Sequence, residues 1–173
     1  TSGSAQSSHE GGTDAVVAIL SANLNSIHAT YLGGSGSDVL FVAEILPSNG
    51  GFLLEGFTTS NDFPNKAGNA QPGYGGGTIF GDTVLVKLAT DLNSYQATYF
   101  GGNGEDFGLI NRHANGELLI AGSTSSTNLP EGLTPCAQPS LCSCPPAFAG
   151  DCFPDRYSAD LKTPQALTTF GSH

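Results

Sequence analysis

The stretch Asp82-Thr-Val-Leu-Val-Lys-Leu-Ala-Thr-Asp-Leu-Asn-Ser-Tyr-Gln-Ala-Thr-Tyr-Phe-Gly-Gly102 decides the fold, because most of it occurs twice. Asp14-Ala-Val-Val-Ala-Ile-Leu20 and Ala29-Thr-Tyr-Leu-Gly-Gly34 match its two ends, both 68 residues earlier. Gly50-Gly-Phe-Leu-Leu-Glu-Gly-Phe-Thr-Thr-Ser60 is likewise repeated as Asn115-Gly-Glu-Leu-Leu-Ile-Ala-Gly-Ser-Thr-Ser125. A weaker third copy begins at Asp155 and ends with Leu167-Thr-Thr-Phe-Gly171. A period of this length indicates supersecondary units that stack on their neighbours, as in propellers or solenoids.

Each full unit contains four short apolar runs, which predict four strands. In the second copy these runs cover residues 82–88, 95–100, 107–112 and 117–123. Neighbouring side chains of a strand point to opposite faces, so Val84, Val86 and Leu88 share one face of the first run. Asn115-Gly116 predicts a hairpin turn, since both residues tolerate a positive φ. Glycines interrupt the runs too often for helices, so we expect an all-β protein.

The arrangement resembles the bacterial seven-bladed β-propeller repeat family. Blades of that family carry an Asp-Ala-Phe-Val-Ala-Lys-Leu-like strand, a Ser-Thr-Tyr-Leu-Gly-Gly segment and a Gly-Asn-Xaa-Tyr-Val-Thr-Gly strand. Their Asp-Phe-Pro turn is matched by Asp62-Phe63-Pro64 and by Asn128-Leu129-Pro130. The resemblance implies sheet blades of the family's type on secreted or surface-bound proteins, and it implies no catalytic residues. The Cys-rich insertion departs from the repeat, and the third copy lacks the Tyr of Tyr-Xaa-Gly-Gly.

The repeat divides the chain into a polar N-terminal arm, a half unit and two full units. Their ranges are 1–12, 13–34, 35–102 and 103–173, with the Cys-rich insertion at 131–154. We expect tandem four-stranded antiparallel blades, ten strands or about two and a half propeller-like units, which one chain does not close. Closed propellers typically have about four to eight blades. The arm is unpatterned, and we expect a mobile segment or a donated strand.

An incomplete set of blades leaves strand edges that can pair with another chain. Either the sequence is a fragment of a longer propeller, or a neighbour supplies the missing strands, and we favour the second. The chain begins with Thr1 and contains no Met, so we expect a processed or excised product. The expected assembly edges are Asp14, Val16 and Ile19 at one end and Leu167, Thr169 and Phe170 at the other.

Composition limits the partners and the compartment. Fifteen acidic residues against five basic ones give a net charge of -10, which argues against nucleic acid as a partner. No apolar stretch is long enough to span a bilayer. Four cysteines in a Pro-rich segment predict two disulfides and an extracellular or cell-surface location, because their spacing matches no usual zinc knuckle. They are Cys136, Cys142, Cys144 and Cys152, and a bridge between Cys142 and Cys144 is the least favoured.

One glycine-rich segment resembles a metal-binding pattern. Gly33-Gly-Ser-Gly-Ser-Asp-Val-Leu-Phe41 fits the calcium nonapeptide, but that pattern works in tandem and the next copy lies 68 residues away. We expect instead an inter-blade turn whose glycines adopt positive φ, and no cofactor. The carboxylates that would suit calcium are Asp38, Glu105 and Asp106. The four histidines show no metal-ligand spacing.

No enzymatic motif stands out. A nucleophile elbow of the form G-x-S-x-G is absent. A pair of opposed carboxylates is the signature of a glycosidase, but Glu55 and Glu117 are expected on the solvent faces of their strands. We therefore expect a non-enzymatic secreted structural protein that assembles with copies of itself into a fibre or surface assembly. The alternative is a glycan- or protein-binding propeller segment, with Tyr74, Phe80, Phe148 and Phe153 in its loops.

Overall fold

The computed structural model describes residues 3–48, 50–65, 68–130, 151–157, 161 and 164–167, and every regular element among them is a β-strand. Ten strands form three antiparallel sheets. The half-blade pairs β1 (Ala15–Leu20) with β2 (Ile27–Leu32). The middle blade has the order β3 (Asp38–Leu46), β4 (Gly51–Thr58), β5 (Asp82–Leu88), β6 (Tyr95–Phe100). The C-terminal blade has the order β7 (Asp106–Arg112), β8 (Leu118–Thr124), β9 (Asp151–Tyr157), β10 (Pro164–Leu167). The expected all-β fold of two and a half open blades is thereby confirmed.

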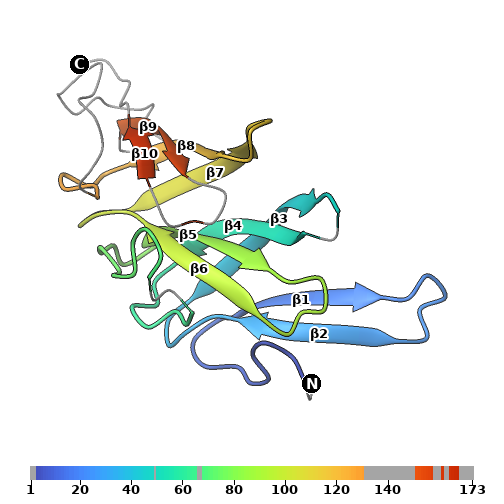
Figure 1. Ribbon diagram of the computed structural model, residues 1–173. Coiled ribbons are helices and arrows are strands. Elements are labelled where there is room, and N and C mark those ends of the chain that lie inside the picture. The colour runs from blue at the N-terminus through green and yellow to red at the C-terminus, as the bar shows by residue number, and fades with distance from the viewer. Residues whose placement is uncertain are drawn as a thin grey trace.

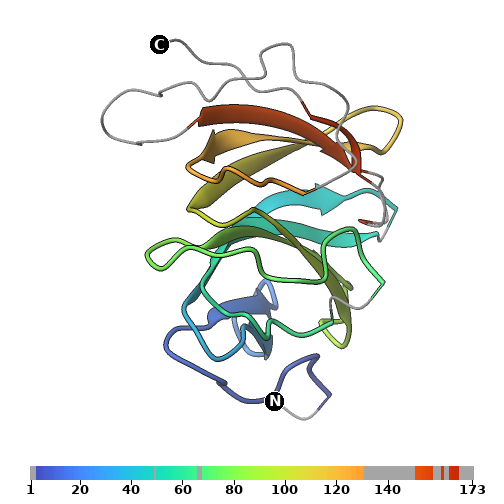
Figure 2. The ribbon, with the colours of Figure 1, turned by 90° about the vertical axis from the view of Figure 1, so that its left-hand side faces the viewer.

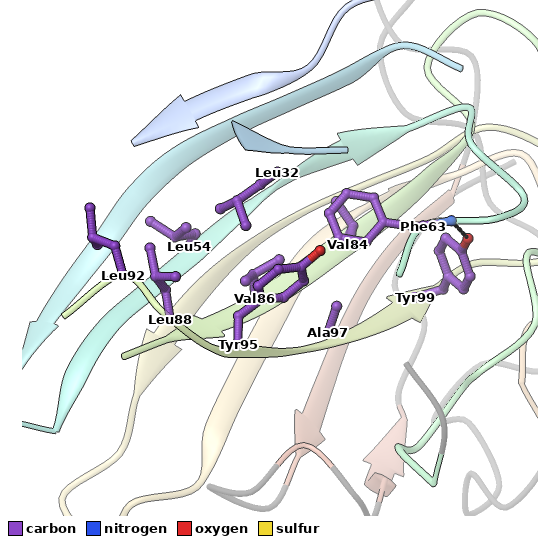
Figure 3. Packing of buried hydrophobic residues seen from close by; sticks show 10 residues of the cluster. All are labelled: Leu32, Leu54, Phe63, Val84, Val86, Leu88, Leu92, Tyr95, Ala97 and Tyr99. Atoms are coloured by element: carbon purple, nitrogen blue, oxygen red, sulfur yellow. Dashed lines mark hydrogen bonds between the residues drawn. The ribbon is translucent and has the colours of Figure 1, made fainter. Parts of the chain in front are cut away.

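The three sheets are stacked face to face, with the half-blade at one end and the C-terminal blade at the other (Figures 1 and 2). One apolar core lies between the half-blade and the middle blade, where Val84, Val86 and Leu88 of β5 are fully buried (Figure 3). A second core joins Leu53 and Leu85 of the middle blade to the C-terminal blade. Both faces of the middle blade are therefore covered, and Val84, Val86 and Leu88 share one of them as predicted.

The third copy of the strand that starts with Asp begins earlier in the structure than its sequence match suggested. Asp151 lies opposite Thr124, just as Asp82 lies opposite Thr58, so Asp151 takes the place that we expected for Asp155. The two alignments differ by four residues, and side chains alternate with a period of two, so both put the same faces inward. The alternating pattern could not distinguish these two registers. The final strand likewise covers Pro164–Leu167.

The N-terminal segment is bound to its own chain and is not a donated strand. The Gln6 carbonyl accepts a hydrogen bond from the Tyr31 N–H at 3.1 Å, and the Gln6 N–H donates to Thr30 Oγ1 at 3.0 Å. Gln71 makes the corresponding contact with the Tyr99 N–H. The described part of the expected arm, residues 3–12, therefore covers the outer edge of β2 as the β4–β5 connection covers β6.

Candidate assembly surface

The outward face of the half-blade is apolar and exposed. In the β1–β2 register, Val16 lies opposite Tyr31, Ala18 opposite Ala29 and Leu20 opposite Ile27, and all six side chains share the face that points away from the middle blade. Val16 is 65% exposed and Ile27 63%. We call these six residues the half-blade face. Exposed apolar surfaces of this kind mark interaction sites in soluble proteins.

The same positions of the next repeat form the centre of the core. The half-blade face corresponds, 68 residues on, to the side chains of β5 and β6 that the half-blade itself covers. These counterparts are at most 7% exposed: Val84, Val86, Leu88, Tyr95, Ala97 and Tyr99. The half-blade face therefore has the composition of a blade interior without the blade that would cover it.

Two further exposed side chains lie beside the open edge of the half-blade. β1 pairs with β2 alone among the described strands, whereas its counterpart β5 pairs with β4 as well as β6. On β3, Val42 is 56% exposed and Ile45 72%. Their register partners are Leu54 and Phe52, which pack in the core between half-blade and middle blade, so Val42 and Ile45 point to the same side. We call the β1 edge together with Val42 and Ile45 the open strand site.

The opposite end of the stack also presents apolar side chains. On the C-terminal blade, Ile110 and Ile120 pack inward against the middle blade. Leu109 and Leu119 alternate with them on β7 and β8, so they point outward and are 52% and 38% exposed. The stack thus ends on both sides in faces of the kind that it buries internally.

The contact between the two complete blades shows how such faces are joined. Arg112 of β7 forms a two-pronged ion pair with Glu44 of β3, with N–O distances of 2.8 and 3.0 Å. The hydrogen bond from Arg112 lowers the pKa of Glu44. Glu55 of β4 accepts a hydrogen bond from the backbone N–H of Ile110. Glu55 is only 8% exposed, and burial raises its pKa, so the expectation that it lies on a solvent face was wrong.

Two buried carboxylates surround a glycine at each inter-blade turn. A Cβ added to Gly101 would lie 2.4 Å from Asp82 Oδ1 and 2.8 Å from Asp106 Oδ2. Gly33 holds the same position between Asp14 and Asp38. Neither glycine has a positive φ, so that expectation was wrong. These glycines are needed because carboxylate oxygens occupy the space of a side chain.

The residues considered for calcium are held by hydrogen-bond donors. Asp38 Oδ2 accepts hydrogen bonds from the Ser60 hydroxyl at 2.7 Å and the Gly34 N–H at 2.9 Å. Asp106 Oδ2 has the corresponding donors in its own repeat. The Glu105 carboxylate accepts four backbone N–H groups, those of residues 78–81. Within the described ranges, no group of three or more His, Cys, Asp or Glu side chains is arranged to hold a metal.

The structure places the expected assembly residues in different surroundings. Val16 lies on the half-blade face, and Ile19, 38% exposed, lies on the other face of β1. The Asp14 side chain is buried and accepts a hydrogen bond from Gln6. Leu167 lies opposite Asp155 at the end of β10, where the backbone alone is described. Thr169 and Phe170 lie outside the described residues.

Sequence reasoning missed Leu20, Ile27, Tyr31, Val42 and Ile45 as surface residues. The signal was available for the first three, because each aligns with a residue of the repeat that a neighbouring blade covers. Cys136, Cys142 and Cys144 lie outside the described residues, and Cys152 is placed only as the backbone partner of Ser123. Of the aromatics expected in loops, Tyr74 contacts Tyr99 edge to face with ring centroids 5.7 Å apart, and Phe80 is 45% exposed. Phe153 lies in β9, so its expected place in a loop was wrong, and Phe148 lies outside the described residues.

Comparisons of the chain with family models, with curated proteins and with solved structures give no match. In the part of the chain that the structure describes, no helix is long and apolar enough to cross a membrane.

Proposed function

We propose that this protein is a non-enzymatic, secreted structural subunit that assembles with copies of itself through the exposed ends of its blade stack. One observation carries the proposal: the half-blade face is 38–65% exposed at Val16, Leu20, Ile27 and Tyr31, although the same positions are covered in the next repeat. Complete burial of one Val, Leu or Ile side chain contributes about 1.5–3 kcal/mol. A second molecule covering this face would therefore gain several kcal/mol.

The outward face of the C-terminal blade is the natural partner of the half-blade face. Within the chain, each blade packs one face against the opposite face of the blade that follows it. Leu109 and Leu119 lie on the outward face at the C-terminal end of the stack, and Val16 lies on the outward face at the half-blade end. Contact between two different faces is heterologous, and it gives a ring if the rotation closes and a filament if it does not.

Light scattering coupled to size exclusion tests the assembly. We expect oligomers or polymers for the native chain and monomers for Val16→Asp, because a carboxylate in that contact would be buried without a partner. Leu24→Asp is the matched control, since Leu24 is 71% exposed but lies in the β1–β2 turn outside the half-blade face. A native chain that stays monomeric at micromolar concentration would refute the proposal, and negative-stain images would distinguish rings from filaments.

Secretion is proposed from the four cysteines of the sequence. Two disulfides are stable in an oxidising compartment and are rare in the cytosol. Mass spectrometry after alkylation should show four protected cysteines in the unreduced native protein and four labelled ones after reduction. Labelling of all four before reduction would contradict this part of the proposal.

Binding of glycans or proteins by the loops is the second candidate function. It is favoured by the loop 78–81, where Ile79 is 72% and Phe80 45% exposed while Glu105 fixes the backbone beneath them. Phe80 also contacts Phe57 edge to face, with ring centroids 5.4 Å apart. Glycan-array binding that Phe80→Ala abolishes, in a protein that remains monomeric, would support this function over assembly.

A further inference from the structure

We infer that the open strand site accepts a β-hairpin of the same type as β3–β4, which completes the half-blade to four strands. The inference rests on the proposed function and specifies the partner of one of its surfaces. In the middle blade, β5 is flanked by β4 and then β3. β1 corresponds to β5, so the unoccupied positions beside β1 are those of a β4-like strand and a β3-like strand.

The packing between complete blades shows what these two strands would cover. β7 of the C-terminal blade packs beneath β3, β4 and β5 of the middle blade. The counterpart of β7 is β3, which contacts β1 of the half-blade. Ile110 of β7 is half-buried, whereas its counterpart Val42 is 56% exposed. A hairpin paired to β1 would therefore extend an interface that already exists, and it would cover Val42 and Ile45.

The register of the incoming strand follows from the repeat. β4 pairs with β5 antiparallel, with Thr58 opposite Asp82 and Phe52 opposite Leu88. Asp14 and Leu20 hold the corresponding places in the half-blade. The partner should thus place a β4-like strand antiparallel to β1 with a residue of Phe52 type opposite Leu20. Extended segments that add to a sheet edge in this way gain affinity from main-chain hydrogen bonds and specificity from alternate side chains.

One acidic side chain should contribute as well. Glu55 of β4 accepts the N–H of Ile110, a donor on the blade below. Val42 corresponds to Ile110, so a hairpin of the β3–β4 sequence would bring its own glutamate to the Val42 N–H. A buried N–H without a partner is unfavourable, so loss of this contact should weaken binding several-fold.

Pairing of two half-blades edge to edge does not fit this site. A two-fold axis that makes β1 antiparallel to its copy keeps the inner faces of both half-blades on the same side. Each half-blade carries a middle blade on that inner face (Figure 2). The second middle blade would have to occupy the region beneath the β1 edge where β3 presents Val42 and Ile45. The partner is therefore one sheet thick at this point, as a hairpin is.

The probe is a fluorescent synthetic peptide with the sequence of residues 38–58, titrated into the full chain and followed by anisotropy. We expect saturable binding that Ile45→Asp weakens at least tenfold. Leu24→Asp is the matched control, because Leu24 is 71% exposed but lies in the β1–β2 turn outside the open strand site. A peptide that carries Glu55→Ala should bind several-fold more weakly than the native peptide. This change cannot unfold the protein.

The outcomes separate this inference from the proposed function. Ile27→Asp should abolish self-assembly but leave peptide binding unchanged, because Ile27 lies on the half-blade face but belongs to β2, which does not border the open strand site. Assembly that Ile27→Asp abolishes, together with no peptide binding by the native chain, would overturn the hairpin inference alone. Peptide binding by a chain that never self-associates would support the hairpin site and refute the assembly. Equal binding of a scrambled peptide, or no effect of Ile45→Asp, would also overturn the inference.

Discussion

Tyr31 on β2 and Tyr99 on β6 hold the same position in consecutive repeats, yet Tyr99 is 1% exposed and Tyr31 is 38% exposed. The Tyr99 hydroxyl donates a hydrogen bond to the Ser60 carbonyl at 2.6 Å. It accepts one from the Phe63 N–H at 3.1 Å (Figure 3). Tyr99 thus anchors β6 to the connection that follows β4 in the same blade.

The two tyrosines give a matched pair of variants. Tyr99→Phe should lower the free energy of unfolding by about 1–3 kcal/mol, because it leaves the Phe63 N–H and the Ser60 carbonyl buried without a partner. Tyr31→Phe should change it by less than about 0.5 kcal/mol in the isolated molecule, as surface substitutions usually do. Urea denaturation measures both values. Equal losses of unfolding free energy in the two variants would show that Tyr31 is already covered in solution.

Much of this fold could be predicted from the sequence because the repeat supplies the same information twice. The strands 82–88 and 95–100 agree with β5 and β6 residue for residue, and the count of ten strands is confirmed. The register of β9 could not be predicted, because alternation with a period of two does not distinguish Asp151 from Asp155 as the first residue. Local pattern fixes which residues face inward, and only pairing with β8 fixes where the strand begins.

The contacts between carboxylates and glycines at the inter-blade turns were harder to predict from the sequence. The motif Gly-Gly-Xaa-Gly-Xaa-Asp correctly indicated a turn between blades, but its glycines suggested positive φ. What they permit is the close approach of two carboxylates that are distant in sequence, such as Asp82 and Asp106 at Gly101. Long-range proximity of this kind requires the stacked sheets. The same holds for Glu55, whose partner Ile110 lies on another blade.

Asp82 should make the stability depend on pH. Burial raises its pKa from an ordinary value of 3.8 to about 7, the Gly75 N–H opposes this shift, and the charge of Asp106 adds to it. A carboxyl group with a higher pKa in the folded state binds its proton more tightly when folded. Its contribution to stability is therefore complete below about pH 4 and is lost as the pH rises to about 7.

The variant Asp82→Asn isolates this contribution. The difference in unfolding free energy between the native chain and Asp82→Asn should fall by up to about 4 kcal/mol from pH 4 to pH 8. Chemical denaturation at a series of pH values gives this difference directly. A pH-independent difference for Asp82→Asn would mean that Asp82 is ionised throughout the range.

Glu105 should order one loop without carrying much global stability. Its carboxylate accepts the N–H groups of Thr78 at 2.7 Å, Phe80 at 2.7 Å and Gly81 at 2.8 Å. Burial raises its pKa, but these donors outweigh that effect, so the pKa of Glu105 is lowered overall. Its stabilising contribution is therefore present at neutral pH and is lost as the pH falls below about 4.5.

Glu105→Ala should accelerate hydrogen exchange at the amides of residues 78–81 by at least tenfold at neutral pH. Amides of β5, such as that of Val86, should change little, because the loop lies outside both cores. Hydrogen exchange followed by nuclear magnetic resonance resolves the two regions. Acceleration of the same size in β5 would show that Glu105 supports the whole middle blade.

Gly101 provides the sharpest test of the carboxylate network. Gly101→Ala would place a Cβ 2.4 Å from Asp82 Oδ1 and 2.8 Å from Asp106 Oδ2, so at least one buried carboxylate must move. Overpacking of this kind costs about 1–3 kcal/mol.

Gly73→Ala is the control, because an added Cβ there meets nothing within 4 Å and no positive φ is involved. That variant should be neutral or stabilising by up to about 1 kcal/mol, since alanine restricts the unfolded chain. Urea denaturation of the two variants should therefore give changes of different size and, where Gly73→Ala stabilises, of opposite sign. A loss of less than about 0.5 kcal/mol for Gly101→Ala would mean that the two carboxylates do not share the space beside this glycine.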